Sequence, residues 1–356
     1  MGKKDMEKRK LEHINICLKE NVESRRTTGF EDVHFVHECI PNINFGDIDC
    51  SCELFGKKLS APIIVAGMTG GHKNTKKINK NIARAVQDLG LGMGVGSQRP
   101  GMEEENLMDT YKVRDEAPDV LLFANLGVSQ FMEYTSKEAN KAVEEIEADV
   151  LAIHFNPLHE VVQPEGNVET KGLKERLKRI IKEVRYPCVA KETGAGISYE
   201  NALELDRMGF SGIDVGGLGG TSFSAVETYR AKESPRKKRL GEVLWDWGIP
   251  TAISTFEVRR ALPDTQIIST GGIRTGLDIA KALALGANAA GIALPVLERA
   301  IKGEKQTKEY LEEIILQLKA VMYLLNAETI KDLKSKHIVV CGKTREYIMA
   351  RGFEIG

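Results

Sequence analysis

A glycine pair late in the chain, Gly271-Gly272, has the setting of an anion-binding turn. A β-branched run at residues 267–269 precedes it and a helix-like segment at residues 277–285 follows it. Glycines let the backbone approach an anion closely, and the next helix offers free N–H groups and the positive end of its dipole. In a (β/α)8 barrel a phosphate site often follows strands seven and eight. The turn therefore predicts a phosphate site, although glycine-rich turns alone are a weak signal.

Polar side chains stand where other strands are expected to end. Thr69, Ser97 and Asn125 can hydrogen-bond the edge of a flat heterocycle. Lys191 can place a positive charge beside a ring that gains electron density, as a reduced flavin does. Alternatively, Lys191 forms a salt bridge inside the barrel to Glu192 or Asp214. With residues 217–221 beside the glycine pair, the pattern favours an FMN barrel.

A second anionic group is also expected. Arg99, with Arg9 and Lys10 near the N-terminus, supplies cations for it. Glu160 is a hard oxygen ligand, which suits Mg²⁺ held jointly with substrate phosphates. The alternative is that Glu160 and its neighbour His159 are solvated loop residues.

Eight short apolar runs recur after residue 60, with helical stretches between them. This alternation is typical of βα units, and eight units favour a closed TIM barrel over an open doubly wound sheet. Residues 250–262 are interpreted as a helix, since their apolar residues recur at helical spacing. The runs are residues 63–66, 92–95, 120–124, 150–155, 188–190, 212–215, 266–269 and 290–294.

The chain is expected to form one structural domain of the α/β class. Residues 1–60 form an N-terminal extension, residues 61–300 the FMN-binding (β/α)8 barrel, and residues 301–356 C-terminal helices that pack outside it. Residues 216–248 are interpreted as a mobile loop over the active face, and its basic cluster at residues 233–239 as a solvated part of that loop.

Smaller elements are expected in the two end segments. Residues 6–18 can form an amphipathic helix. Residues 33–35 and 48–54 can be short strands of a hairpin that covers the barrel floor. The tail is expected to be helical at residues 310–325 and 330–351.

Composition gives general limits. The chain has 356 residues, 42% of them hydrophobic and 28% charged, with a net charge of −1, so nothing draws it globally to nucleic acid or anionic membranes. No apolar run approaches the roughly 20 residues of a membrane span. The charged N-terminus is unlike a secretory signal, and the six cysteines show no paired metal spacing. A cytoplasmic protein with reduced thiols is expected.

Segments spread over nearly the whole chain resemble one known family. They are Arg9-Lys10 with His13, TTGF at 27–30, MTGG at 68–71, GSQR at 96–99, HFN at 154–156 with Glu160, QPEG at 163–166, residues 191–192, GGT at 219–221 and GIRTG at 272–276. The family is the type 2, FMN-dependent isopentenyl-diphosphate isomerases, in an archaeal style. The resemblance implies interconversion of isopentenyl and dimethylallyl diphosphate by a 1,3-proton shift. It also implies Mg²⁺, FMN reduced by NADPH and serving as the acid–base group, and a homo-oligomer, either a tetramer or an octamer.

The resemblance also assigns site residues. It implies diphosphate contacts from His154 and Asn156, which together with His159 support catalysis, and a metal ligand in Glu160. The implied substrate-binding set is Arg9, Lys10, Ser97, Gln98, Arg99 and His159. The implied FMN set is Met68, Thr69, Gly70, Ser97, Asn125, Lys191, Gly216, Thr221, Gly272, Ile273, Arg274, Ala293 and Leu294.

Two residues depart from the family pattern. His159 stands where glutamine is usual, and Phe223 stands where tryptophan is common. A histidine both donates and accepts hydrogen bonds only as a neutral tautomer, so His159→Gln is expected to preserve or raise activity. His154 can alternatively be a buried, hydrogen-bonded histidine.

Other functions fit the sequence less well. An FMN oxidoreductase of the 2-hydroxy-acid type uses a similar barrel, but it would want a histidine base near the later strands and arginines for a carboxylate. A non-catalytic barrel that binds a phosphorylated ligand would need neither the flavin-edge groups nor Glu160. A nucleic-acid role rests on residues 236–239 alone.

Overall fold

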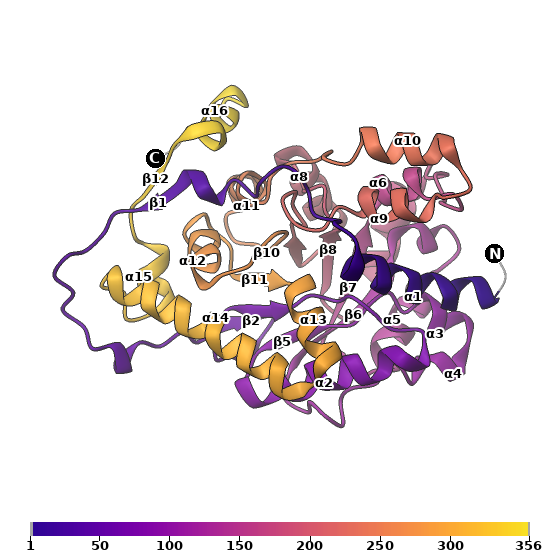
Figure 1. The fold of residues 1–356 in the computed structure, drawn as a ribbon, viewed down its shortest axis with the longest axis horizontal. Helices are drawn as coiled ribbons and strands as arrows, with labels where there is room; N and C mark the ends of the chain where they lie inside the picture. The colour runs from indigo at the N-terminus through magenta and orange to yellow at the C-terminus, as the bar shows by residue number, and fades with distance from the viewer. Residues whose placement is uncertain (1–2, 355–356) are drawn as a thin grey trace.

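The computed structural model describes the backbone of residues 3–354 and the side chains from Lys10 onward (Figure 1). Eight parallel strands close into a barrel in the order β10-β11-β4-β5-β6-β7-β8-β9. All eight predicted strands and the TIM-barrel fold are therefore confirmed. The strands are β4 (Ile63–Val65), β5 (Gly92–Gly94), β6 (Leu121–Gly127), β7 (Val150–Phe155), β8 (Cys188–Glu192), β9 (Gly212–Asp214), β10 (Gln266–Thr270) and β11 (Ala289–Ile292).

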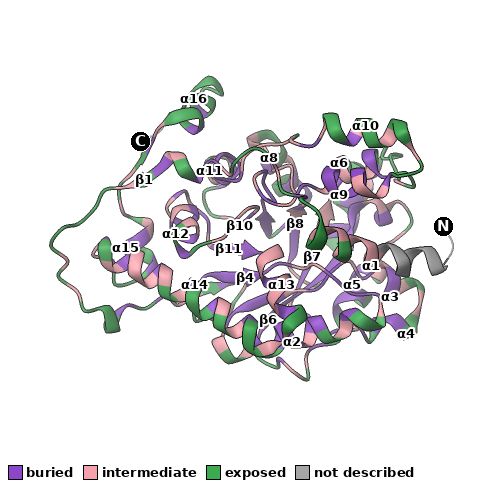
Figure 2. Ribbon diagram, viewed as in Figure 1, coloured by how far each residue is buried: buried purple, intermediate pink, exposed green. Residues whose placement is uncertain are grey.

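The strands are buried on both faces, which explains their continuous apolar runs. Every residue of β6 is buried, and Figure 2 shows buried strands inside helices whose outer faces are exposed. Predicted residues 250–262 form helix α11, as expected. The helices around the barrel are α2 (Lys73–Leu89), α3 (Arg99–Glu103), α4 (Glu105–Met108), α5 (Ser136–Glu144), α6 (Pro157–Val162), α7 (Leu173–Glu183), α8 (Tyr199–Met208), α11 (Thr251–Ala261), α12 (Gly276–Ala284) and α13 (Leu294–Lys302).

A hairpin covers the barrel floor, but its strands differ from the predicted pair. It joins β2 (Cys52–Leu54) to β3 (Lys57–Leu59), and Leu54 and Leu59 pack in one cluster with inward-facing residues of the barrel strands. The strand at residues 33–35, β1 (Val33–Phe35), pairs instead with β12 (Ile338–Val340) near the other end of the chain. Apolar alternation predicts a strand but does not identify its partner, which explains the wrong pairing.

The C-terminal segment is helical with one interruption. Helix α14 (Glu304–Leu324) confirms the first predicted helix. The second prediction, a helix over residues 330–351, was wrong, because α15 (Ile330–Lys334) and α16 (Gly342–Ala350) are separated by β12. The β-branched run Ile338-Val339-Val340 favours the strand.

Residues 216–248 were predicted to be a mobile loop, and this prediction was wrong. They contain helices α9 (Phe223–Arg230) and α10 (Pro235–Val243), which pack against each other. Ser222 caps α9 by accepting a hydrogen bond from the N–H of Ala225, and Pro235 begins α10. The basic cluster lies mainly on α10, where Lys237 Nζ donates to the carbonyl oxygen of Val161 at 2.7 Å.

Helix α1 (Lys3–Lys19) contains the predicted N-terminal helix and lies across the carboxyl-end side of the barrel (Figure 1). Its residues His13, Ile14 and Cys17 line the cavity found there. Within the described part of the chain, no helix combines the length and apolar character needed to cross a membrane.

Candidate functional site

A cavity of about 450 Å³ opens at the carboxyl ends of the barrel strands. Its lining comes from all eight strand ends and from α1, because parallel strands bring their carboxyl ends to one rim. Most predicted site residues meet there although they are spread over the chain. The predicted residues that line it are Lys10, Met68, Thr69, Ser97, Arg99, Asn125, His154, Asn156, His159, Glu160, Lys191, Gly216, Thr221, Gly272, Ile273, Arg274, Ala293 and Leu294.

Three predicted residues are not among those lining the cavity. Gln98 is fully buried, donating from Nε2 to the carbonyl oxygen of Ala142 and accepting the N–H of Asn125, both at 2.8 Å, and its substrate contact stays a prediction. Gly70 packs on Tyr111, whose ring would lie 1.9 Å from an added Cβ. The side chain of Arg9 lies outside the described residues.

The glycine turn after β10 forms a cradle of main-chain groups. Among the described residues, the N–H groups of Gly272 and Ile273 have no hydrogen-bond partner. The N-terminus of α13, at Ala293 and Leu294, lines the same cavity and adds the positive end of a helix dipole. Free amides beside a helix N-terminus fit a phosphate group.

Gly272→Ala is expected to weaken FMN binding about 10- to 150-fold. The backbone has φ +70°, and an added Cβ would lie 2.4 Å from the carbonyl oxygen of Gly219. The turn must therefore shift and lose a charged hydrogen bond to the phosphate, which contributes about 1.5–3 kcal/mol. Titration of flavin fluorescence measures the affinity. Gly172→Ala is the matched control, since Gly172 has φ +83° but nothing within 4 Å of its Cβ position. Equal FMN affinities in the two variants would contradict a phosphate at this turn.

Three buried polar atoms in the same cavity lack hydrogen-bond partners within the described part of the chain. Thr69 Oγ1, Thr270 Oγ1 and Gln130 Nε2 are buried without a hydrogen-bond partner among the described residues, and all three side chains line the cavity. An unpaired buried polar atom is unfavourable, so these atoms favour a polar ligand at this place. A flat heterocycle with hydrogen-bonding edges supplies matching groups.

Lys191 contacts both the cavity and an acidic partner. Its Nζ lies 2.8 Å from Asp214 Oδ2, and the side chains are 12% and 8% exposed. The salt bridge considered as an alternative is therefore present, while Lys191 still lines the cavity. The ammonium group has three donors, so it can bind Asp214 and a ring edge together.

His154 and Asn125 form a pair at the ends of neighbouring strands. His154 Nδ1 lies 2.8 Å from Asn125 Oδ1, and the Asn125 side chain donates to the carbonyl oxygen of Val95 at 3.1 Å. Burial lowers the pKa of His154 to about 3, so the ring is neutral at physiological pH. His154 is thus a hydrogen-bonded histidine that still lines the cavity.

Glu160 is held in place at the start of α6. Its carboxylate accepts hydrogen bonds from Asn156 Nδ2 at 3.0 Å and from the N–H of Asn167 at 2.7 Å. Because Glu160 lines the cavity, its oxygens suit a hard cation completed by water and phosphate. Arg99 lies on the same cavity and pairs with Glu103 at 2.7 Å.

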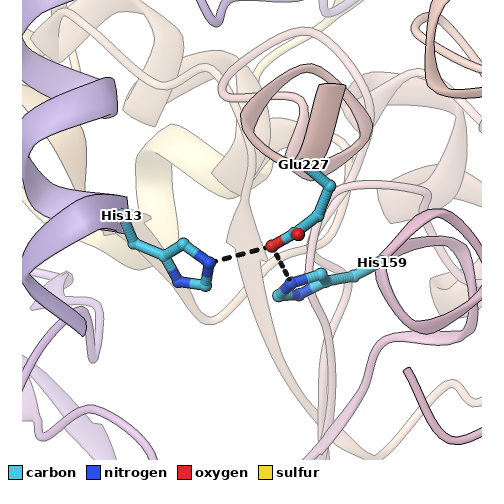
Figure 3. Close-up of side chains that lie close together, drawn as sticks. All are labelled: His13, His159 and Glu227. Atoms are coloured by element: carbon cyan, nitrogen blue, oxygen red, sulfur yellow. Dashed lines mark hydrogen bonds and ion pairs between the residues drawn. The ribbon is translucent and has the colours of Figure 1, made fainter. Parts of the chain in front are cut away.

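A group of four residues, His13, His159, Glu227 and Arg230, contains members that the sequence analysis did not identify as functional. Both histidines point their Nε2 atoms at one carboxylate oxygen, Glu227 Oε1, each at 2.8 Å (Figure 3). Arg230 Nη1 binds the other oxygen, Oε2, at 2.6 Å. Glu227 and Arg230 were overlooked because α9 was interpreted as loop. Their spacing by three residues, within a capped helix, is the signal that could have found them.

Ionic hydrogen bonds and ring stacking hold these four side chains in position. Burial alone would raise the pKa of Glu227, but hydrogen bonds from His13 and His159 hold it well below its usual range. Burial lowers the pKa of His13 to about 4, so that ring is neutral. The ring of His159 stacks on Phe223 at 5.0 Å, so the two residues that depart from the family pattern contact each other.

The sequence of this chain is similar to those of known proteins over nearly its whole length. A family profile described as FMN-dependent dehydrogenase matches residues 2–106 and 159–340. An isopentenyl-diphosphate delta-isomerase of Methanothermobacter thermautotrophicus is 48% identical over 97% of both chains. Enzymes of the same name from Thermococcus kodakarensis and Archaeoglobus fulgidus are 49% and 45% identical, over 99% and 97% of this chain and 97% and 99% of theirs.

Solved structures of similar fold are more distant in sequence. A mandelate oxidase variant with a monooxide FMN adduct superposes with a TM-score of 0.62 at 18% identity, over 88% of this chain and 90% of its own. Mandelate oxidase with a difluorinated phenylpropionic acid gives 0.62 at 16% identity, over 96% and 99%. At this identity the likeness shows a shared fold.

Proposed function

Since the chain belongs to the FMN-dependent dehydrogenase family and, within it, to the type 2 isopentenyl-diphosphate delta-isomerases, we propose that its cavity interconverts isopentenyl and dimethylallyl diphosphate. One observation carries the proposal: a phosphate cradle, a set of unpaired buried polar atoms and the Glu160 carboxylate line one cavity. These features suit a bound flavin at one end and a diphosphate with its cation at the other.

FMN fits the residues present. The Gly272 and Ile273 amides with the start of α13 would hold its phosphate, while Thr69, Thr270 and Lys191 would face its ring. Reduced FMN, with NADPH as reductant, would supply the acid–base group for the 1,3-proton shift.

The diphosphate would be held by cations and hydrogen-bond donors around Glu160. Glu160 would be the protein's ligand to Mg²⁺, which would neutralise the phosphate oxygens. Lys10 on α1 and Arg99 at the start of α3 contribute positive charge, and Asn156 donates to the Glu160 carboxylate and orients it. His154 is neutral and donates from Nδ1 to Asn125 Oδ1, so its Nε2 is an acceptor that can meet a protonated phosphate oxygen or a water ligand of the cation.

The alkenyl end needs an apolar, water-poor wall. Ile14 and Cys17 of α1 line the cavity, and burial raises the pKa of the Cys17 thiol to about 11, so that it stays neutral. We infer that α1 excludes water from the reacting carbons. The homo-oligomer, a tetramer or octamer, stays a prediction, and light scattering tests it by measuring the molar mass in solution.

The oxidoreductase alternative is less well supported. Of the described residues, the histidines that line the cavity are His13 on α1, His154 on β7 and His159 on α6, so none comes from the later strands. Two parallel assays compare the isomerase proposal with the oxidoreductase alternative. One contains reduced FMN and isopentenyl diphosphate, and the other contains FMN and lactate or glycolate. Turnover of a 2-hydroxy acid without turnover of isopentenyl diphosphate would favour the oxidoreductase over the isomerase.

His159→Gln is expected to change kcat/KM by less than about tenfold, with preserved or raised activity. A glutamine amide can still donate to Glu227 Oε1, so the hydrogen bond to this charged group, worth about 1.5–3 kcal/mol, is kept. His159→Leu is the informative comparison, since it removes the donor at similar bulk. Steady-state kinetics of both variants separate the cases, and a large loss in His159→Gln would give the imidazole a role of its own.

A further inference from the structure

Three side chains of different elements converge on one point beside the cavity. His13 comes from α1, His159 from α6 and Glu227 from α9, and their nearest ligand atoms all lie within 4.8 Å of one another (Figure 3). We propose that His13, His159 and Glu227 form a binding site for one transition-metal ion of the Zn²⁺ or Co²⁺ type, separate from the Mg²⁺ ligand Glu160.

The geometry is close to what such an ion needs. Zinc lies about 2.0–2.2 Å from nitrogen and oxygen ligands, so tetrahedral ligand atoms are roughly 3.3 Å apart. The two Nε2 atoms each lie 2.8 Å from Glu227 Oε1, so a small outward movement of the rings admits the ion. Each ring proton then moves from Nε2 to Nδ1, which leaves the Nε2 lone pair to coordinate the ion.

The hydrogen bonds within the group match the roles that metal ligands take. Metal ligands must be neutral imidazoles and an ionised carboxylate. Both rings donate from Nε2 to Glu227 Oε1, so this oxygen already accepts from the two groups that would share an ion with it. Glu227 is fully buried, so its position is fixed by packing before any ion arrives.

Local charge also permits a cation. Arg230 is a neighbouring positive group, but it binds Oε2 of Glu227 and leaves Oε1 for the ion. Its charge is offset by Glu165 at 2.8 Å and Glu12 at 3.4 Å. Three carboxylates therefore face one guanidinium around the site, while Lys10 on the cavity wall opposes binding.

The site differs in chemistry from the one at Glu160. Two imidazoles and a carboxylate suit Zn²⁺, Co²⁺ or Fe²⁺, whereas Mg²⁺ prefers oxygen ligands. His13 and His159 line the cavity, so a remaining coordination position faces it. A bound ion would therefore occupy space beside the substrate and inhibit turnover.

A Co²⁺ titration of the purified full-length protein with millimolar Mg²⁺ present tests the proposal. The expected result is one Co²⁺ per chain, with visible d–d absorption that Zn²⁺ displaces. His159→Gln is expected to weaken binding at least about 100-fold, because loss of a residue that only hydrogen-bonds a metal ligand already weakens metal sites about 10- to 100-fold. Glu160→Gln and the exposed-histidine control His34→Gln are expected to bind Co²⁺ as the parent does.

Three results would overturn the site. They are no saturable Co²⁺ binding, binding that His159→Gln leaves intact, and binding that Glu160→Gln or His34→Gln abolishes. Because the titration needs neither FMN nor substrate, failure here leaves the isomerase proposal untouched. A second readout is Zn²⁺ inhibition of turnover, which His159→Gln is expected to relieve.

Discussion

Lys191→Met is expected to destabilise the protein by about 3–5 kcal/mol, since removing one member of a buried ion pair leaves the other charge without compensation. Lys191 Nζ and Asp214 Oδ2 are 2.8 Å apart on neighbouring strands of the barrel, and both side chains are nearly buried. Urea unfolding of parent and variant measures the loss. The same change removes positive charge beside the proposed flavin ring, so the reduction potential of bound FMN should fall.

A double variant separates the two effects. Lys191→Met with Asp214→Asn has neither buried charge, so most of the lost stability should return. The reduction potential should nevertheless stay low, because the ammonium group is still missing. A double variant as unstable as the single one would show that the ion pair is not the cause. A parent-like potential in both would remove Lys191 from the flavin site.

Glu160→Gln is expected to lower kcat/KM by about 10²–10³-fold, the effect of losing one preorganised group that stabilises charge. Glutamine can still accept from the N–H of Asn167, so the local fold should be kept, but a neutral amide binds Mg²⁺ weakly. Kinetics over a range of Mg²⁺ concentrations should show a rightward shift with unchanged FMN affinity. The exposed Glu169→Gln is the control. An unchanged Mg²⁺ response in Glu160→Gln would move the metal elsewhere.

The barrel could be predicted from sequence because each of its strands has a pattern that is visible within a few neighbouring residues. Each strand is a short apolar run bounded by polar residues, and eight such runs have few other arrangements. The same topology brings the ends of the strands to one rim. Because Thr69, Asn125 and Lys191 were predicted to lie at strand ends, the sequence also predicted that they would line one cavity.

Other features depended on contacts between distant segments. The pairing of β1 with β12 joins residues about 300 positions apart, and nothing in either short strand specifies its partner. Glu227 was missed because α9 was interpreted as a loop, although Ser222 carries a capping signal. Gln98 was assigned to substrate by resemblance, whereas burial commits its side chain to main-chain groups.

The proposed activity is tested most directly by NMR in D₂O, without oxygen, on protein with FMN, NADPH, Mg²⁺ and isopentenyl diphosphate. Dimethylallyl diphosphate that carries deuterium is the expected product, and no product is expected when FMN or the reductant is omitted. Protein with bound, reduced FMN that leaves isopentenyl diphosphate unchanged would contradict it.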